Sequence, residues 1–152
     1  MKIKLFRRPG HKVKLVNSIT GIISGLTGDW FTKDAAEYIP LDLYYQDMFF
    51  LFNKGEAVSF IIFTCIDGKI TITLMATKPE NRNAGYGTTL FRHFEKYVKE
   101  KLFRTILVQT VPQESNPNYR GTIAFYKKMG FEMTRVFKDL WETGAIQLEK
   151  SL

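Results

Sequence analysis

The six residues from Arg82 to Gly87 (Arg-Asn-Ala-Gly-Tyr-Gly) combine one cationic side chain with two glycines directly before a helical pattern. The first turn of a helix has backbone N–H groups without intrahelical partners and a partial positive charge. Glycines let the backbone bend and let a phosphate approach the amides without a Cβ in the way, and Arg82 can add a charge-assisted hydrogen bond. The residue types therefore indicate a phosphate-binding loop. The simpler interpretation is a tight strand-to-helix turn without a ligand.

Two common phosphate loops do not match this stretch. A Walker loop needs four residues between its glycines and then Gly-Lys followed by Ser or Thr, and the chain has no such run. A dinucleotide fingerprint needs a third small residue where Leu90 stands. A different class of phosphate ligand is therefore expected.

The elements around the loop fit this interpretation. Residues 70–77 alternate between apolar and more polar side chains, the period of a half-buried strand, and Pro79 ends that strand. From Gly87 onward, apolar residues recur at the spacing of a helix with one buried stripe: Leu90, Phe91, Phe94, Tyr97, Val98 and Leu102. The loop thus joins a strand to the first turn of a long amphipathic helix.

This order, with Arg82-x-x-Gly85-x-Gly87 after the strand, resembles the acyl-CoA loop of the GNAT superfamily of N-acetyltransferases. The resemblance covers roughly half the chain, from about Asn53 to Phe131. It implies acetyl-CoA as co-substrate. It also implies that the backbone of the strand end meets pantetheine, and the residues concerned are Met75, Ala76 and Thr77. The pyrophosphate would be held by Arg82, Asn83, Ala84, Gly85, Tyr86, Gly87 and Thr88.

A second motif, Phe125-Tyr126-x-x-x-Gly130-Phe131, resembles the family's F/L-Y-x-x-x-G-F signature. In that family the tyrosine often faces the CoA sulfur, so Tyr126 is the candidate general acid that protonates the leaving thiolate. A core aromatic on an amphipathic helix is the competing interpretation.

Two departures from the family pattern leave the mechanism open. Tyr119 stands where the family commonly has an asparagine that contacts CoA, and the strand carries no glutamate to act as base. Glu80 and Glu114 are weak loop candidates for that base. The expected function is direct transfer of an acetyl group from acetyl-CoA to a primary amine. A catalytically silent CoA-binding sensor or interaction domain is the alternative.

The whole chain is expected to form one GNAT-like domain, residues 1–152, of the α+β (mixed α/β) class. The resemblance implies a mostly antiparallel mixed sheet with a central, splayed parallel pair and helices on both faces. The patterns predict strands over 1–6, 48–53, 57–66, 70–77, 105–111, 131–137 and 145–149. They predict helices over 11–26, 33–39, 87–102 and 120–129, the second N-capped by Thr32 and closed by Pro40.

Composition narrows the class of protein. The 152 residues carry a net charge of +7, and six cations precede the first acid: Lys2, Lys4, Arg7, Arg8, Lys12 and Lys14. Such a run is more often a solvated edge than a nucleic-acid site, so a nucleic-acid partner is not expected. One cysteine, two histidines and no long apolar run favour a cytoplasmic protein without a metal site, a disulfide or a membrane span.

The acceptor is not specified by the sequence. In the resembled family, the early helical segment and the last hairpin wall the acceptor pocket, which here places aromatic residues there: Trp30, Phe31, Tyr38, Tyr44, Tyr45 and Trp141. A small amine or a protein amine could fit, and the chain could be a monomer or a homodimer.

Overall fold

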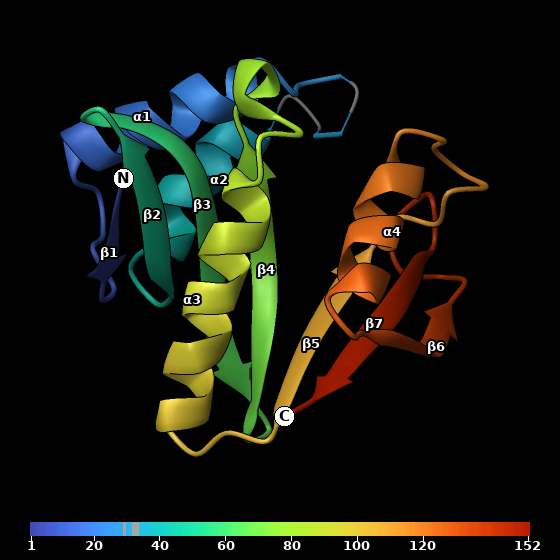
Figure 1. The fold of residues 1–152 in the computed structure, drawn as a ribbon. Helices are drawn as coiled ribbons and strands as arrows, with labels where there is room; N and C mark the ends of the chain where they lie inside the picture. The colour runs from blue at the N-terminus through green and yellow to red at the C-terminus, as the bar shows by residue number, and fades with distance from the viewer. Residues whose placement is uncertain (29, 32–33) are drawn as a thin grey trace. The chain divides into compact units, whose positions relative to one another are not determined.

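The computed structural model describes residues 1–28, 30–31 and 34–152 (Figure 1). The strands are β1 (Lys2–Phe6), β2 (Asp47–Asn53), β3 (Glu56–Ile66), β4 (Lys69–Thr77), β5 (Thr105–Thr110), β6 (Glu132–Phe137) and β7 (Ala145–Ser151). The helices are α1 (Val13–Ser24), α2 (Ala35–Asp42), α3 (Tyr86–Glu100) and α4 (Tyr119–Lys128), with a 3-10 turn, η1, over Pro79–Asn81. Each predicted strand and helix has a counterpart among the described residues, with ends shifted by a few residues, but the predicted end of α2 is wrong.

The strands form a mixed sheet in the order β1-β2-β3-β4-β5-β7-β6. Antiparallel pairing joins β1 to β2, β2 to β3, β5 to β7 and β6 to β7, whereas β4 and β5 run parallel. The predicted fold class, with one parallel pair in a mostly antiparallel sheet, is confirmed. The parallel pairing runs from Ile70–Ile106 to Ile72–Val108. The splay expected beyond that point stays a prediction.

The chain divides into two units: unit 1 is residues 1–64 with 74–97, and unit 2 is residues 65–73 with 98–152. The single functional domain expected over residues 1–152 therefore stays a prediction, and each unit is described by itself.

Unit 1 has helices on both faces of its strands (Figure 1). On one face, Phe50 and Phe60 belong to a buried cluster with residues of α1 and α2. Because neighbouring strand residues point to opposite faces, Phe49 and Phe63 point the other way, and there they meet α3. The ring centroids of Phe63 and Phe94 are 5.0 Å apart. The predicted stripe is confirmed where its residues are buried, at Leu90, Phe91, Phe94 and Val98. It is wrong at Leu102, which lies beyond the end of α3 and is exposed.

Unit 2 has its own buried residues. Ile106 and Val108 of β5 and Leu148 of β7 are buried, as are the side chains on one face of α4 and just after it: Ile123, Tyr126, Met129 and Phe131. Burial alternates along β5, where Ile106, Val108 and Thr110 are buried and the residues between them are not. This core fixes the helix that carries Tyr126.

Both predicted hairpins have the tight turns that their sequences favour. Lys54 and Gly55 have φ of 52° and 81°, and Asp67 and Gly68 have φ of 52° and 75°. Two consecutive positive φ values match the twist of the flanking strands. The β2–β3 turn sets the pairs Asn53–Glu56 and Phe52–Ala57, and a bulge then shifts the register so that Leu51 pairs with Ser59.

The prediction for α2 needs a correction. Pro40 lies inside the helix and is buried, and the helix continues to Asp42. Proline there removes one intrahelical hydrogen bond, but the buried side chains of Ile39 and Leu43 hold the last turn, and the Leu43 N–H still bonds to the Ile39 carbonyl, 3.2 Å away. The predicted cap Thr32 and first residue Lys33 lie outside the described residues.

Candidate functional site

The loop from Arg82 to Gly85 connects η1 to α3 in unit 1. Helix α3 begins at Tyr86, one residue before the predicted start, so Tyr86, Gly87 and Thr88 form its first turn. Gly85, directly before the helix, has φ of 84°, which L side chains rarely adopt. A Cβ added there would meet nothing within 4 Å. Gly85 is therefore required by the turn, and it leaves open space next to the helix start.

The first turn of α3 presents backbone donors. Its first i to i−4 bond runs from the Thr89 N–H to the Gly85 carbonyl, with an N···O distance of 3.0 Å. The amides of Tyr86, Gly87 and Thr88 precede that bond, so helix geometry gives them no intrahelical acceptor. Together with the helix dipole, they form an N-terminus suited to a phosphate.

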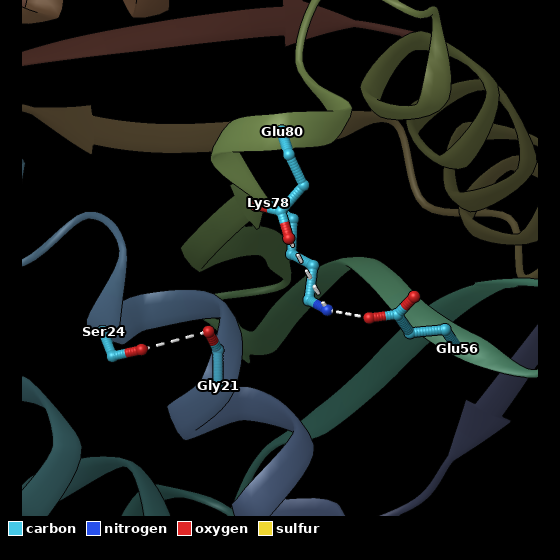
Figure 2. Close-up of polar contacts among 5 residues, drawn as sticks. All are labelled: Gly21, Ser24, Glu56, Lys78 and Glu80. Atoms are coloured by element: carbon cyan, nitrogen blue, oxygen red, sulfur yellow. Dashed lines mark hydrogen bonds and ion pairs between the residues drawn. The ribbon is translucent and has the colours of Figure 1, made fainter.

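Three side-chain contacts hold the loop and its flanks. The Asn53 amide nitrogen donates to the Tyr86 hydroxyl at 2.8 Å, which ties the helix start to the end of β2. The Arg82 guanidinium lies over the Trp30 ring, 4.4 Å from its centroid. Lys78 forms an ion pair with Glu56, and Figure 2 shows its amine directed at that carboxylate. Trp30 was expected in the wall of the acceptor pocket, and none of these three contacts was predicted from the sequence.

The end of β4 is fixed by a buried serine. Ser59 is fully buried and donates its hydroxyl proton to the Ala76 carbonyl, with an O···O distance of 3.0 Å. Its oxygen also lies 2.8 Å from the Thr77 hydroxyl oxygen. Because Ser59 has one proton and gives it to Ala76, Thr77 must donate to Ser59. The three residues predicted to meet pantetheine, Met75 to Thr77, thus include two that are locked to β3.

Tyr126 lies in unit 2, near the end of α4. The Gly130 N–H bonds to the Lys127 carbonyl and the Phe131 N–H to the Tyr126 carbonyl, both at 3.0 Å, and Gly130 has φ of 100°. This is a Schellman ending, in which the residue after the glycine packs on the helix. Here the Phe131 and Tyr126 ring centroids are 5.2 Å apart.

Burial dominates the electrostatics of Tyr126. Only 4% of the residue is exposed, and desolvation raises the pKa of its phenol well above the ordinary value of 10.0. The hydroxyl therefore stays protonated over the whole physiological range. The general-acid role and the core-aromatic interpretation are both compatible with this environment.

The remaining candidates are Glu80 and Glu114 for the catalytic base, and Tyr119 at the position where the family commonly has an asparagine. Glu80 is exposed, and its carboxylate is 3.9 Å from the Lys78 amine (Figure 2). Glu114 lines a surface hollow with Gln113, Pro117 and Arg120. Burial raises the pKa of the Tyr119 phenol.

The described part of the chain contains neither a group of side chains that could bind a metal nor a helix that could span a membrane. Among residues 1–28, 30–31 and 34–152, no group of three or more His, Cys, Asp or Glu side chains could hold a metal ion. No helix in the same residues has the length and apolarity to cross a bilayer. The cytoplasmic location stays a prediction.

Comparisons with known proteins agree with these observations. A family model described as an acetyltransferase (GNAT) domain matches residues 45–133. A GNAT-family acetyltransferase from Desulfovibrio desulfuricans has a similar fold, with a TM-score of 0.80, 15% identity and coverage of 99% of this chain and 98% of that one. A search of curated proteins found no match.

Two further solved structures contain the coenzyme. PaiA N-acetyltransferase from Thermoplasma acidophilum, in complex with coenzyme A, has a TM-score of 0.73 at 16% identity, and the match covers 100% of both chains. A GNAT acetyltransferase from Elizabethkingia anophelis with acetyl-CoA bound has a TM-score of 0.74 at 18% identity, covering 99% of this chain and 98% of that one. Because the family model spans more than half of the sequence, the chain belongs to the GNAT acetyltransferases, which use acetyl-CoA.

Proposed function

We propose that this GNAT acetyltransferase transfers the acetyl group of acetyl-CoA directly to a primary amine, with the pyrophosphate of CoA at the start of α3. The observation that carries the proposal is the geometry there: Gly85 at φ of 84° with open space beside it, followed by amides that precede the first intrahelical bond. Arg82 adds a positive charge at the same loop. These groups fit a diphosphate better than they fit a plain structural turn.

The end of β4 supplies the contacts for the thioester arm. Backbone groups of Met75, Ala76 and Thr77 would pair with the pantetheine amides in the manner of an added strand. A backbone N–H near Ala76 or Thr77 would stabilise the oxyanion. Ser59 supports this role because its buried hydroxyl fixes the Ala76 carbonyl and thereby the orientation of the neighbouring peptide units. A fixed donor costs no reorganisation during the reaction.

In the proposed reaction, a neutral amine attacks the thioester carbonyl carbon and forms the new C–N bond. The C–S bond then breaks, the CoA thiolate leaves, and the new amide nitrogen gives its extra proton to a water molecule. Tyr126 would donate a hydrogen bond to the departing sulfur. Its raised pKa keeps the phenol protonated, and a thiol such as cysteine has a pKa of about 8.5. Tyr126 therefore acts mainly as a donor that stabilises the thiolate charge.

A test of the function measures CoA thiol release from acetyl-CoA across a panel of amines, with mass spectrometry to detect the acetylated product. Thiol release that requires an amine supports the transferase. Direct transfer further predicts that Cys65→Ser, which removes the chain's one thiol, stays active and that no acetylated enzyme accumulates. A cysteine-linked intermediate would instead make this variant inactive.

A catalytically silent CoA-binding domain is the second candidate. It is favoured by the absence of a carboxylate on β4, where the polar face of the strand carries Thr71 and Thr73. Calorimetry separates the two functions. Binding of acetyl-CoA without thiol release for any amine in the panel would favour the silent domain.

A further inference from the structure

The contact between Trp30 and Arg82 joins two distant parts of the sequence in unit 1. Arg82 begins the phosphate loop, whereas Trp30 lies in the segment between α1 and α2. The guanidinium lies over the indole ring at 4.4 Å from the centroid, a distance at which the cation is attracted by the ring quadrupole. Arg82 is otherwise exposed, so this ring is the flat surface on which its guanidinium rests.

The position of Trp30 is itself fixed. Its backbone N–H bonds to the carbonyl of Leu26, 3.0 Å away, and Leu26 is buried in the core. Just before Leu26, a Cβ added to Gly25 would lie only 2.8 Å from Cγ of Pro79, the first residue of η1. The chain at Gly25, five residues before Trp30, therefore packs directly against the turn that leads to Arg82.

We propose that Trp30 is a positioning residue, which holds the Arg82 guanidinium in place for the diphosphate of CoA. This inference rests on the proposed function, because it takes Arg82 as a phosphate ligand. The five N–H donors of a guanidinium lie in its plane and point outward from its rim. In a face-to-face arrangement over the indole ring, only the face of the guanidinium would be covered, and its donors would stay available for bidentate contacts with phosphate oxygens.

The stack also lowers the cost of binding. A long, exposed arginine side chain samples many rotamers, and fixing it on a ligand costs conformational entropy. A ring that already holds the guanidinium reduces that cost before the ligand arrives. Removing the ring should therefore weaken binding moderately. The same change should have no effect on binding in a protein that already lacks Arg82.

A double-mutant cycle tests this dependence. Calorimetry would give the Kd of acetyl-CoA for the wild type, W30A, R82A and the double variant, with thermal denaturation confirming that each is folded. We expect W30A to raise Kd about two- to fivefold, equivalent to about 0.4–1 kcal/mol. In the R82A background, the same change should have no further effect. W30F, which keeps an aromatic face, should restore most of the affinity.

The matched control is Phe137→Ala, because the Phe137 ring also lies under an arginine, with the Arg135 guanidinium 4.7 Å from its centroid, but belongs to unit 2. It should leave Kd unchanged. Should W30A fail to fold, W30L keeps apolar volume without a π face and takes its place in the cycle. An equal rise in Kd with and without Arg82, or no rise at all, would overturn the positioning role. Failures at earlier steps are distinguishable: unchanged Kd in R82A removes Arg82 from the site, and a wild type that does not bind acetyl-CoA overturns the proposed function.

Discussion

The phosphate-loop assignment makes a quantitative prediction at Gly85. Replacing it with alanine adds a Cβ at a residue with φ of 84° and no neighbour within 4 Å. The cost to folding is then only the left-handed backbone, about 1–2 kcal/mol, which lowers the Tm by about 2–8 °C for a chain of this length. The same Cβ would occupy the space through which a phosphate reaches the amides. Loss of one such charge-assisted hydrogen bond, worth about 1.5–3 kcal/mol, should raise the Kd of acetyl-CoA by about ten- to hundredfold.

Gly68 provides a matched control for this substitution. It has φ of 75° and also no neighbour within 4 Å, but it lies in the hairpin between β3 and β4. Gly68→Ala should lower Tm by a similar amount and leave Kd unchanged. Calorimetric titration and thermal denaturation of both variants give the two quantities. A folded Gly85→Ala variant that binds acetyl-CoA with wild-type affinity would refute the phosphate-loop reasoning.

Four further predictions concern other parts of the chain. Tyr126→Phe should lower kcat and kcat/KM together by about 10²–10³, the effect of losing one hydrogen-bond donor to a developing negative charge. A steady-state assay should show less loss for acyl donors that have a more acidic thiol, and full activity would make Tyr126 a packing residue. The pKa of Tyr126 is raised in the folded protein, so the unfolded state loses the phenol proton at a lower pH than the folded state does. The free energy of unfolding of the wild type should therefore fall as the pH rises above about 10. Urea titrations should show a steeper fall for the wild type than for the Tyr126→Phe variant. Reversing Lys2, Lys4 and Arg7 to Glu should leave turnover and Kd unchanged, because these exposed residues form a solvated edge; a tenfold loss, about 1.4 kcal/mol, would place them in a binding site. Ser59→Ala should lower the free energy of unfolding by about 1–3 kcal/mol in denaturant titrations, and an unchanged value would mean that its two hydrogen bonds do not stabilise β4.

Local sequence signals predicted most of the fold because several of them agreed. In β4, the alternation of side chains marks the two faces of the strand, and Pro79 marks its end. The structure has this strand at Lys69–Thr77. The hairpins were equally readable, since Gly55 and Gly68 supply positive φ in their turns. Pro40 was misread because the rule used was local, whereas the packing that retains the proline inside α2 comes from the buried core.

The side-chain contacts that hold the candidate site in place were harder to predict, because they join residues that are distant in the sequence. Asn53 and Tyr86, or Trp30 and Arg82, have no spacing in the sequence that relates them, and only the folded unit 1 brings them together. Ser59 did leave a signal: it is the one hydroxyl in the apolar run from Ala57 to Phe63. A polar side chain at a buried strand position must find a partner, and the partner here is the backbone of the strand end.

The two interpretations of Tyr126 are less opposed than the sequence suggested. The spacing from Tyr126 to Gly130 and Phe131 is the spacing of a Schellman ending, so the glycine is set by backbone geometry and the phenylalanine by its contact with the tyrosine ring. This accounts for the motif without any chemistry. Yet the same contact restrains the ring, and burial keeps its proton in place. A hydrogen-bond donor that must not ionise or rotate needs such surroundings, so the packing of Tyr126 is the means by which a catalytic hydroxyl would be held. Only the Phe variant, which keeps the ring and removes the hydroxyl, separates the helix-ending role from the chemical one.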